Sequence, residues 1–449
     1  MTLRIYVACL VAWSTFLWCA DLCALTKAKL ANGLTVFVQR DARAPRVGIA
    51  VSYRVGARDD PRGRRGLAHV IEHVMFDEAN EGAGYARVLD AAGASVINGS
   101  VGVDDTTFVT EMPARAYRTG LWVEAHRMAY VLRTVSEEQV GRVLRVVADE
   151  ETLRRSHGAG LGHRALRELL VPPGHPYALL FRSPIGQKRL IAQDLDAIGL
   201  DEVAWGHQRF FRPSNATLAV VGDVDEQEVL AEAQRYFGPI RAVGPDPVPP
   251  SETLGPRTAE RRGIVDEPGR ESRLIIGWLA PPARSAELAA LYVADAHLDG
   301  AFGPVRVELV DATDDVDAAV VGLVPAELAS FFSIDLTLAG AADPRNVFPL
   351  ADAVVDQVRR PLPEAAVEAA KRRVAARVAR WLERPLTRAK YLARREEPLE
   401  ELGRRVAQVN ATVVADVASR WLAPEARALL LVEPAATRQS AGELVAGWR

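Results

Sequence analysis

Beyond its first 24 residues the chain contains no cysteine, because its three cysteines are Cys9, Cys19 and Cys23. A mature chain starting at residue 25 therefore has no disulfide and no thiolate metal ligand, so any metal site must use histidine, aspartate or glutamate. The 449 residues also lack a strong charge of either sign. Their formal net charge is −3, which gives no reason to expect a nucleic-acid partner. No low-complexity tract and no heptad run is present.

Long hydrophobic runs are missing as well, except at the N-terminus. One Arg4 precedes a mostly apolar stretch from Ile5 to Ala20, and no acidic residue occurs before Asp21. This pattern predicts a secretory signal peptide over residues 1–24, cut after Ala24, and hence an exported protein, periplasmic or extracellular. An uncleaved membrane anchor is the alternative, although about sixteen apolar residues are fewer than the roughly 20 that span a bilayer.

The length of the chain predicts two domains of roughly 200 residues each. Residues 242–256 carry five prolines and predict a linker between an N-terminal domain, 25–241, and a C-terminal domain, 257–449. Residues 410–436 repeat, weakly but in the same order, the pattern of residues 200–224. Because strand-like segments come in clusters, we predict an α+β fold of two related domains, each a mostly antiparallel sheet flanked by helices.

The segment Gly-Leu-Ala-His-Val-Ile-Glu-His-Val-Met-Phe, residues 66–76, has apolar residues on several sides and predicts a mostly buried helix. Residues 94–113 predict strands interrupted at the turn-prone Asn98-Gly99. A further helix is predicted to begin with a capping box formed by Ser136 and Gln139.

The 66–76 helix contains the chain's strongest metal-binding pattern. His69 and His73 are four residues apart, on one helix face, and can reach one Zn²⁺, while Glu72 can address a water on that metal. Such histidine pairs also arise by chance on solvated helix faces. Here the apolar neighbours favour a metal, because burying three ionisable groups without a partner is costly.

A third protein ligand is required. Glu150 and Glu151 lie near the edge of the apolar face of a later helix, and periodicity does not choose between them. The other histidines considered lie in contexts more typical of structural or solvated residues: His126, His157, His163 and His175.

With these residues the sequence resembles the pitrilysin-type (M16) zinc metallopeptidases, which include insulin-degrading enzyme and the mitochondrial processing peptidase. The family's inverted His-x-x-Glu-His motif is followed, after 76 residues (74–149 here), by a zinc-binding glutamate. The resemblance therefore implies that His69, His73 and Glu150 hold one zinc ion per chain and that Glu72 is the general base.

The resemblance covers nearly all of residues 26–440 and also implies a substrate chamber between the domains. It assigns Asn98, Gly99 and Ser100 to an edge strand that accepts the substrate backbone. Two segments depart from the family: residues 76–79 read Phe-Asp-Glu-Ala, and residues 298–325 replace a Gly-rich segment, an Arg-rich helix and a strand. The Arg and Tyr that grip substrate in the family's second half have no counterpart that can be placed.

We therefore predict an exported zinc endopeptidase that hydrolyses peptides or small unfolded proteins. The missing grip favours a zinc-bearing subunit that works as a homodimer or with a second, related subunit. No nucleic-acid partner is expected, and membrane contact is expected only through an uncleaved leader. The alternatives are a non-catalytic scaffold or partner subunit, and a metal-storage protein, which would not need Glu72.

Overall fold

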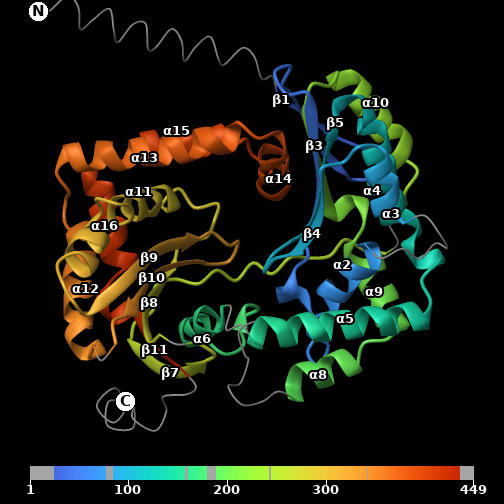
Figure 1. Cartoon of the computed structure of the whole chain (residues 1–449). Helices are drawn as coiled ribbons and strands as arrows, with labels where there is room; N and C mark the ends of the chain where they lie inside the picture. Colours follow the sequence, from blue (N-terminus) through green and yellow to red (C-terminus); the bar gives the residue numbers. More distant parts are fainter. Residues whose placement is uncertain are drawn as a thin grey trace, which may run out of the picture.

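We describe a computed structural model of the chain over residues 25–76, 84–156, 160–178, 189–241, 244–269, 271–340 and 342–434 (Figure 1). The predicted signal peptide, residues 77–79 of the first departing segment, and His157 lie outside this range. No helix in the described ranges has the length and apolar character that a membrane crossing needs.

The first sheet has six strands in the order β1-β2-β6-β3-β5-β4. Among its neighbouring pairs only β2 and β6 run parallel. The strand bounds are β1 Leu25–Lys29, β2 Thr35–Arg40, β3 Arg46–Tyr53, β4 Val96–Val101, β5 Thr106–Pro113 and β6 Ala216–Gly222.

The first half of the chain also contains helices. Their bounds are α2 Leu67–Phe76, α3 Tyr85–Ala91, α4 Tyr117–Tyr130, α5 Glu137–Ser156, α6 Leu161–Leu170, α8 Arg189–Asp196, α9 Leu200–Phe210 and α10 Glu226–Phe237. The 3-10 turn η1, Ala57–Asp59, precedes α2. The predicted burial of α2 is confirmed, since seven of its ten residues are buried.

The second sheet has the order β7-β11-β8-β10-β9, in which only β7 and β11 run parallel. This order matches β2-β6-β3-β5-β4 of the first sheet strand for strand, so the two halves share one plan. The strands are β7 Arg261–Glu267, β8 Arg273–Ala280, β9 Val316–Val324, β10 Ser330–Leu338 and β11 Arg427–Pro434. The predicted α+β fold of two related, mostly antiparallel sheets flanked by helices is confirmed.

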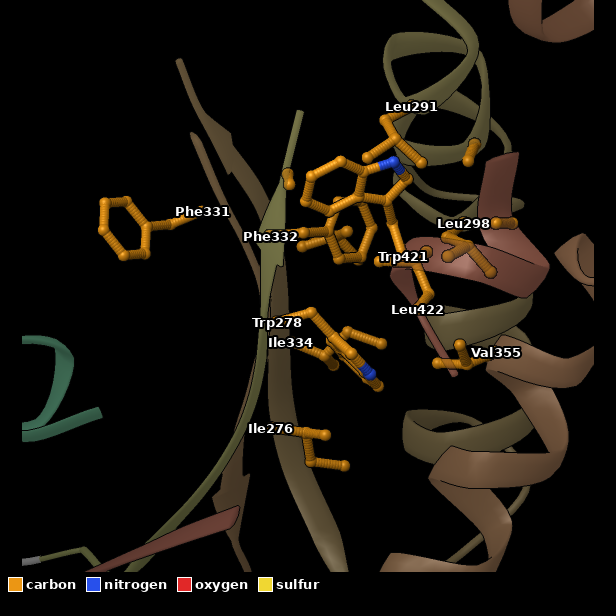
Figure 2. Close-up of a cluster of buried hydrophobic side chains, with 14 of the residues drawn as sticks. Ile276, Trp278, Leu291, Leu298, Phe331, Phe332, Ile334, Val355, Trp421 and Leu422 are labelled. Atoms are coloured by element: carbon orange, nitrogen blue, oxygen red, sulfur yellow. The ribbon is translucent and has the colours of Figure 1, made fainter. Parts of the chain in front are cut away.

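The core of the second half lies between this sheet and its helices. Trp278, Phe332 and Ile334 point from β8 and β10 toward the helices, whereas Phe331 points to the opposite face (Figure 2). The helices of the second half are α11 Leu288–Leu298, α12 Pro344–Val358, α13 Glu364–Leu382, α14 Pro385–Arg395, α15 Leu399–Ala407 and α16 Ala411–Trp421, of which α14 packs on the first sheet. Successive side chains of a strand point to opposite faces of the sheet, so the neighbouring apolar residues Phe331 and Phe332 bury both faces.

One helix from each half of the chain packs on the sheet of the other half (Figure 1). Helix α6 packs on β7, β8 and β11, and buries Leu166 and Leu170 in the second core. Helix α14 packs on β3, β5 and β6, where Leu392 is 1% exposed. The approach of α14 is so close that a Cβ atom at Gly48 would lie 2.5 Å from the Leu386 Cα atom. Both sheets are therefore covered on two faces, one of them by a helix from across the molecule.

The described part of the predicted linker, residues 244–256, contains neither helix nor strand. The domain bounds themselves stay a prediction. The expected interruption at Asn98-Gly99 is wrong, because both residues lie inside β4, paired with Val109 and Phe108. The turn falls instead at residues 102–105, where the Gly102 N–H donates to the Asp105 carbonyl at 2.7 Å. The local turn preference of Asn-Gly yields here to pairing with β5.

Candidate metal centre

Helix α2 is fixed in place at its start and along one side. The Asp60 carboxylate accepts hydrogen bonds from the N–H groups of Gly66, at 2.7 Å, and Ala68, at 2.9 Å. These bonds satisfy donors that the first helical turn leaves without partners. Burial nevertheless raises the pKa of Asp60 to about 7. Val70, Val74 and other apolar side chains of α2 are buried in the first core.

The remaining side of α2 carries His69, Glu72 and His73, and α5 packs against it. The predicted capping box of α5 is confirmed: the Ser136 N–H donates to Gln139 Oε1 at 2.7 Å, and the Gln139 N–H donates to Ser136 Oγ at 3.3 Å. A helix that starts at a defined residue brings a side chain three to four turns later to a defined place. That side chain is Glu150.

Three side chains meet between α2 and α5. The Nε2 atoms of His69 and His73 lie 3.2 Å apart. Glu150 Oε2 lies 3.4 Å from His69 Nε2, and Glu150 Oε1 lies 3.5 Å from His73 Nε2. Tetrahedral coordination with bonds of about 2.0–2.1 Å separates neighbouring ligand atoms by roughly 3.3–3.4 Å. The donor set and its spacing therefore fit a zinc ion with a fourth position left open.

Glu72 stands slightly apart from this trio. Its Oε2 atom lies 4.0 Å from His69 Nε2 and 3.8 Å from His73 Nε2, beyond the spacing of ligand atoms on one tetrahedral ion. Its side chain is buried. Among the described residues, one group of side chains could hold a metal ion by proximity, and Glu72 belongs to it together with His69 and His73. A carboxylate in this position can address a water held between it and the trio.

The structure separates the two candidate glutamates. Glu151 Oε1 accepts a hydrogen bond from Arg164 Nη1 at 3.0 Å, whereas the Glu150 oxygens face the histidines. Successive helical residues point about 100° apart, so one of two neighbours can face α2 and the other must turn away. The role of Glu150 as a ligand stays a prediction.

The other histidines lie at separate places. His126 Nδ1 bonds the Tyr85 hydroxyl at 2.8 Å. The His175 Nε2–H donates to the Glu252 carbonyl at 3.0 Å. His163, on α6, lies 3.8 Å from Asp335 Oδ2 of the second sheet. Each of these three thus has a local structural partner.

Strand β4 borders the site. Within the described residues it pairs only with β5, so its other edge has no strand partner. Asn98 and Ser100 are exposed on it. Gly99 lies so close to α2 that a Cβ atom there would stand 2.1 Å from Glu72 Oε1 and 2.6 Å from Phe76 Cε2. Position 99 therefore leaves room for the Glu72 carboxylate.

The tip of the β4–β5 hairpin is held by charges that the sequence did not single out. Buried Arg58 donates to Asp104 Oδ1 at 2.5 Å and to Glu327 Oε2, in the β9–β10 turn, at 2.9 Å. Asp104 also accepts from the Tyr177 hydroxyl at 2.6 Å and from the Glu327 N–H at 2.8 Å. This network joins the edge strand to the second half. Arg58 and Asp60 lie in the charged segment before α2, and no sequence pattern in that segment indicates the contacts that they make.

The departing segment 298–325 contains a one-turn π-helix, η5, Val305–Val310, followed by β9. Residues 298–325 contain no Tyr and one arginine, Arg306. The Arg306 side chain is half-exposed and donates to Asp311 Oδ1 at 2.8 Å.

Two family models match the chain. Residues 35–125 match the one described as insulinase (peptidase family M16), and residues 197–374 match the one described as peptidase M16 inactive domain. The first match includes His69, Glu72 and His73 as well as Asn98, Gly99 and Ser100, and it stops before Glu150.

Among curated proteins, zinc protease PqqE of Helicobacter pylori is 25% identical over 289 residues, which cover 63% of this chain and 63% of that protein. Coenzyme PQQ synthesis protein F of Pseudomonas aeruginosa is 29% identical over 282 residues, 61% of this chain and 34% of that protein. The chain thus matches less than two thirds of either relative's length.

Solved structures give the same fold over most of the chain. A protease from Helicobacter pylori superposes with a TM-score of 0.81 at 19% identity, covering 92% of this chain and 100% of that one. A peptidase M16 inactive domain from Pseudomonas fluorescens superposes with a TM-score of 0.77 at 16% identity, covering 92% and 98%.

Proposed function

Because the chain belongs to the M16 peptidase family, we propose that it is a zinc-dependent endopeptidase acting on peptides or small unfolded proteins. One observation carries this proposal. His69, His73 and Glu150 present ligand atoms 3.2–3.5 Å apart, and Glu72 stands just outside them. A storage site would gain nothing from this second carboxylate, which stands outside the ligand set.

The chain's own residues divide the work. His69, His73 and Glu150 would hold one zinc ion, which supplies Lewis-acid activation of a water molecule and of the peptide carbonyl. The Glu72 carboxylate would take a proton from the attacking water and deliver it to the departing amine nitrogen. Its buried position between α2 and β4 limits the orientations that its carboxylate can adopt.

The free edge of β4 supports a mode of substrate binding. An extended peptide can add to this edge as a further strand, with main-chain hydrogen bonds near Asn98 and Ser100. Such binding favours extended backbone over particular side chains, which suits peptides and unfolded proteins. We assign these substrates to a chamber that faces β4.

Export and partnership complete the proposal. The apolar leader, 1–24, supports secretion to the periplasm or the cell exterior. The segment 298–325 contains no Tyr, and its one arginine, Arg306, bonds Asp311, which supports a second subunit, identical or related, that supplies the substrate grip.

The test uses purified residues 25–449, zinc analysis and cleavage of a quenched fluorescent peptide. Glu72→Gln should keep about one zinc per chain and lose turnover, whereas Glu150→Gln should lose zinc. Glu151→Gln is the matched control, because Glu151 bonds Arg164 instead of facing the histidines. Loss of zinc in Glu151→Gln with retention in Glu150→Gln would overturn the ligand assignment.

A non-catalytic scaffold or partner subunit is the second candidate. It is favoured by the match of residues 197–374 to a domain described as inactive. Wild-type protein without bound zinc would establish this candidate. Zinc with chelator-sensitive cleavage would exclude it, and zinc without cleavage, restored by a second subunit, would support the divided enzyme.

A further inference from the structure

A pocket of about 270 Å³ lies in the second half, away from the α2–α5 site, among α11, α13, α14 and α15. Its walls combine aliphatic side chains such as Leu288 and Leu402 with the aromatic rings of Tyr292, Trp381 and Tyr391. A volume near the lower end of those found for small-molecule sites suits a ligand built around one ring or one branched side chain.

The charge on these walls is mostly positive. Four basic residues, Lys390, Arg394, Arg395 and Arg405, line the pocket together with one acidic residue, Glu397. A buried or half-buried charge is costly without a partner, so the partners of each cation decide which of them can bind a ligand.

The three arginines have partners within the protein. Arg394 bonds Asp105 at the tip of the β4–β5 hairpin. Arg405 bonds Glu397, and also Glu401 at 3.2 Å. Arg395 donates to the Pro325 carbonyl at 3.2 Å. These groups are committed to the fold.

Lys390 differs from them. In the ranges that the structure describes, no group forms a hydrogen bond or ion pair with its ammonium. Partial burial and the neighbouring Arg394 lower the pKa of Lys390, while Asp105 acts in the opposite direction. Among the described residues, Lys390 is thus the one cation of the pocket wall without a hydrogen-bond or ion-pair partner, and it lies beside apolar and aromatic side chains.

We propose that this pocket binds a small monocarboxylate with an aromatic or branched apolar body, its carboxylate on Lys390 and its body among Tyr292, Trp381 and Leu402. A carboxylate can accept a charge-assisted hydrogen bond from the Lys390 ammonium, which removes the cost of leaving that ammonium without a partner. An apolar body fills walls that a free phosphate ion would leave uncovered. The site is separate from the proposed zinc centre and does not depend on it.

Calorimetric titration of the zinc-loaded protein, residues 25–449, with benzoate tests this site. Benzoate should bind, and benzamide, which has the same ring without the charge, should bind at least about tenfold more weakly. Inorganic phosphate should also bind more weakly than benzoate. No benzoate binding, equal binding of benzamide, or tighter binding of phosphate would each overturn the proposal.

Variants locate the binding. Lys390→Met should weaken benzoate binding by at least about tenfold. Arg380→Met, at an exposed position of α13 outside the pocket lining, should leave the affinity unchanged. His69→Ala should also leave it unchanged, which distinguishes this pocket from a carboxylate bound at zinc. If benzoate binds Lys390→Met as tightly as wild type, the assignment is wrong. The comparison of benzoate with benzamide on wild-type protein stands even if Lys390→Met misfolds.

Discussion

Replacing Gly99 by alanine tests whether β4 and the Glu72 carboxylate are fitted to each other. The added methyl group would stand 2.1 Å from Glu72 Oε1, whereas ordinary contact begins at 3.4 Å. The carboxylate or the strand must therefore move by about 1.3 Å. The methyl group cannot avoid Glu72 by shifting toward Phe76, because it would already lie 2.6 Å from the Phe76 Cε2 atom.

The size of the effect follows from the role proposed for Glu72. A misplacement of about 1 Å at a reacting group can cost roughly 100-fold in rate, and a general base contributes about 10²–10⁴-fold. We expect Gly99→Ala to lower kcat/KM for a fluorescent peptide by about 100-fold, chiefly through kcat. Zinc content should stay near one per chain, because Glu72 is not among the three proposed ligands.

A matched control exists on the second sheet. Gly322 lies in β9, the strand whose place corresponds to β4, and a Cβ atom there would meet only Ser333 Oγ, at 3.7 Å. Gly322→Ala should therefore keep its activity. Wild-type turnover by Gly99→Ala, with zinc bound, would refute the claim that this glycine makes room for the base.

Three further predictions concern stability. Asp60→Ala removes two hydrogen bonds at the start of α2 and should lower the free energy of unfolding by about 2–4 kcal/mol in urea titrations; no change would mean that water replaces the carboxylate. Leu392→Ala on α14 should cost about 2–5 kcal/mol, against under 0.5 kcal/mol for the half-exposed Leu350→Ala, and equal losses would contradict the packing described. Burial lowers the pKa of His207 to about 4, so the contribution of the neutral imidazole to folding stability is complete above pH 6.5 and is lost as the pH falls through 4. The difference in the free energy of unfolding between wild type and His207→Asn should therefore shrink by up to about 3 kcal/mol between pH 6.5 and 4. A difference that stays constant with pH would contradict this prediction.

Much of the candidate site could be predicted from the sequence because its residues are close together in it. His69, Glu72 and His73 occupy two turns of one helix, so helical spacing alone places them on one side. Glu150 was different. Periodicity left Glu150 and Glu151 equivalent, and only the family resemblance and then the contact between Arg164 and Glu151 separated them.

Other features depend on contacts between residues far apart in the chain. The Asn98-Gly99 pair has a strong local turn preference, which pairing with β5 overrides. The amphipathic pattern of α14 indicates a helix with a buried face but not the sheet on which it packs. The contacts of Arg58 join loops more than 200 residues apart, from Arg58 itself to Glu327, so no local pattern reports them.

Helices α6 and α14 each pack on the sheet of the other half, and this packing determines where the chain tolerates a cut. Residues 244–256 look like a place to divide the protein, yet a fragment ending there would keep α6 without the sheet it covers and would lose α14 from its own sheet. Separate fragments would expose apolar surface and aggregate, whereas fragments produced together would reassemble into one particle. Proteolysis at this segment would then leave a nicked but intact molecule, so the peptide connection there is less important to its integrity than the two crossed helices.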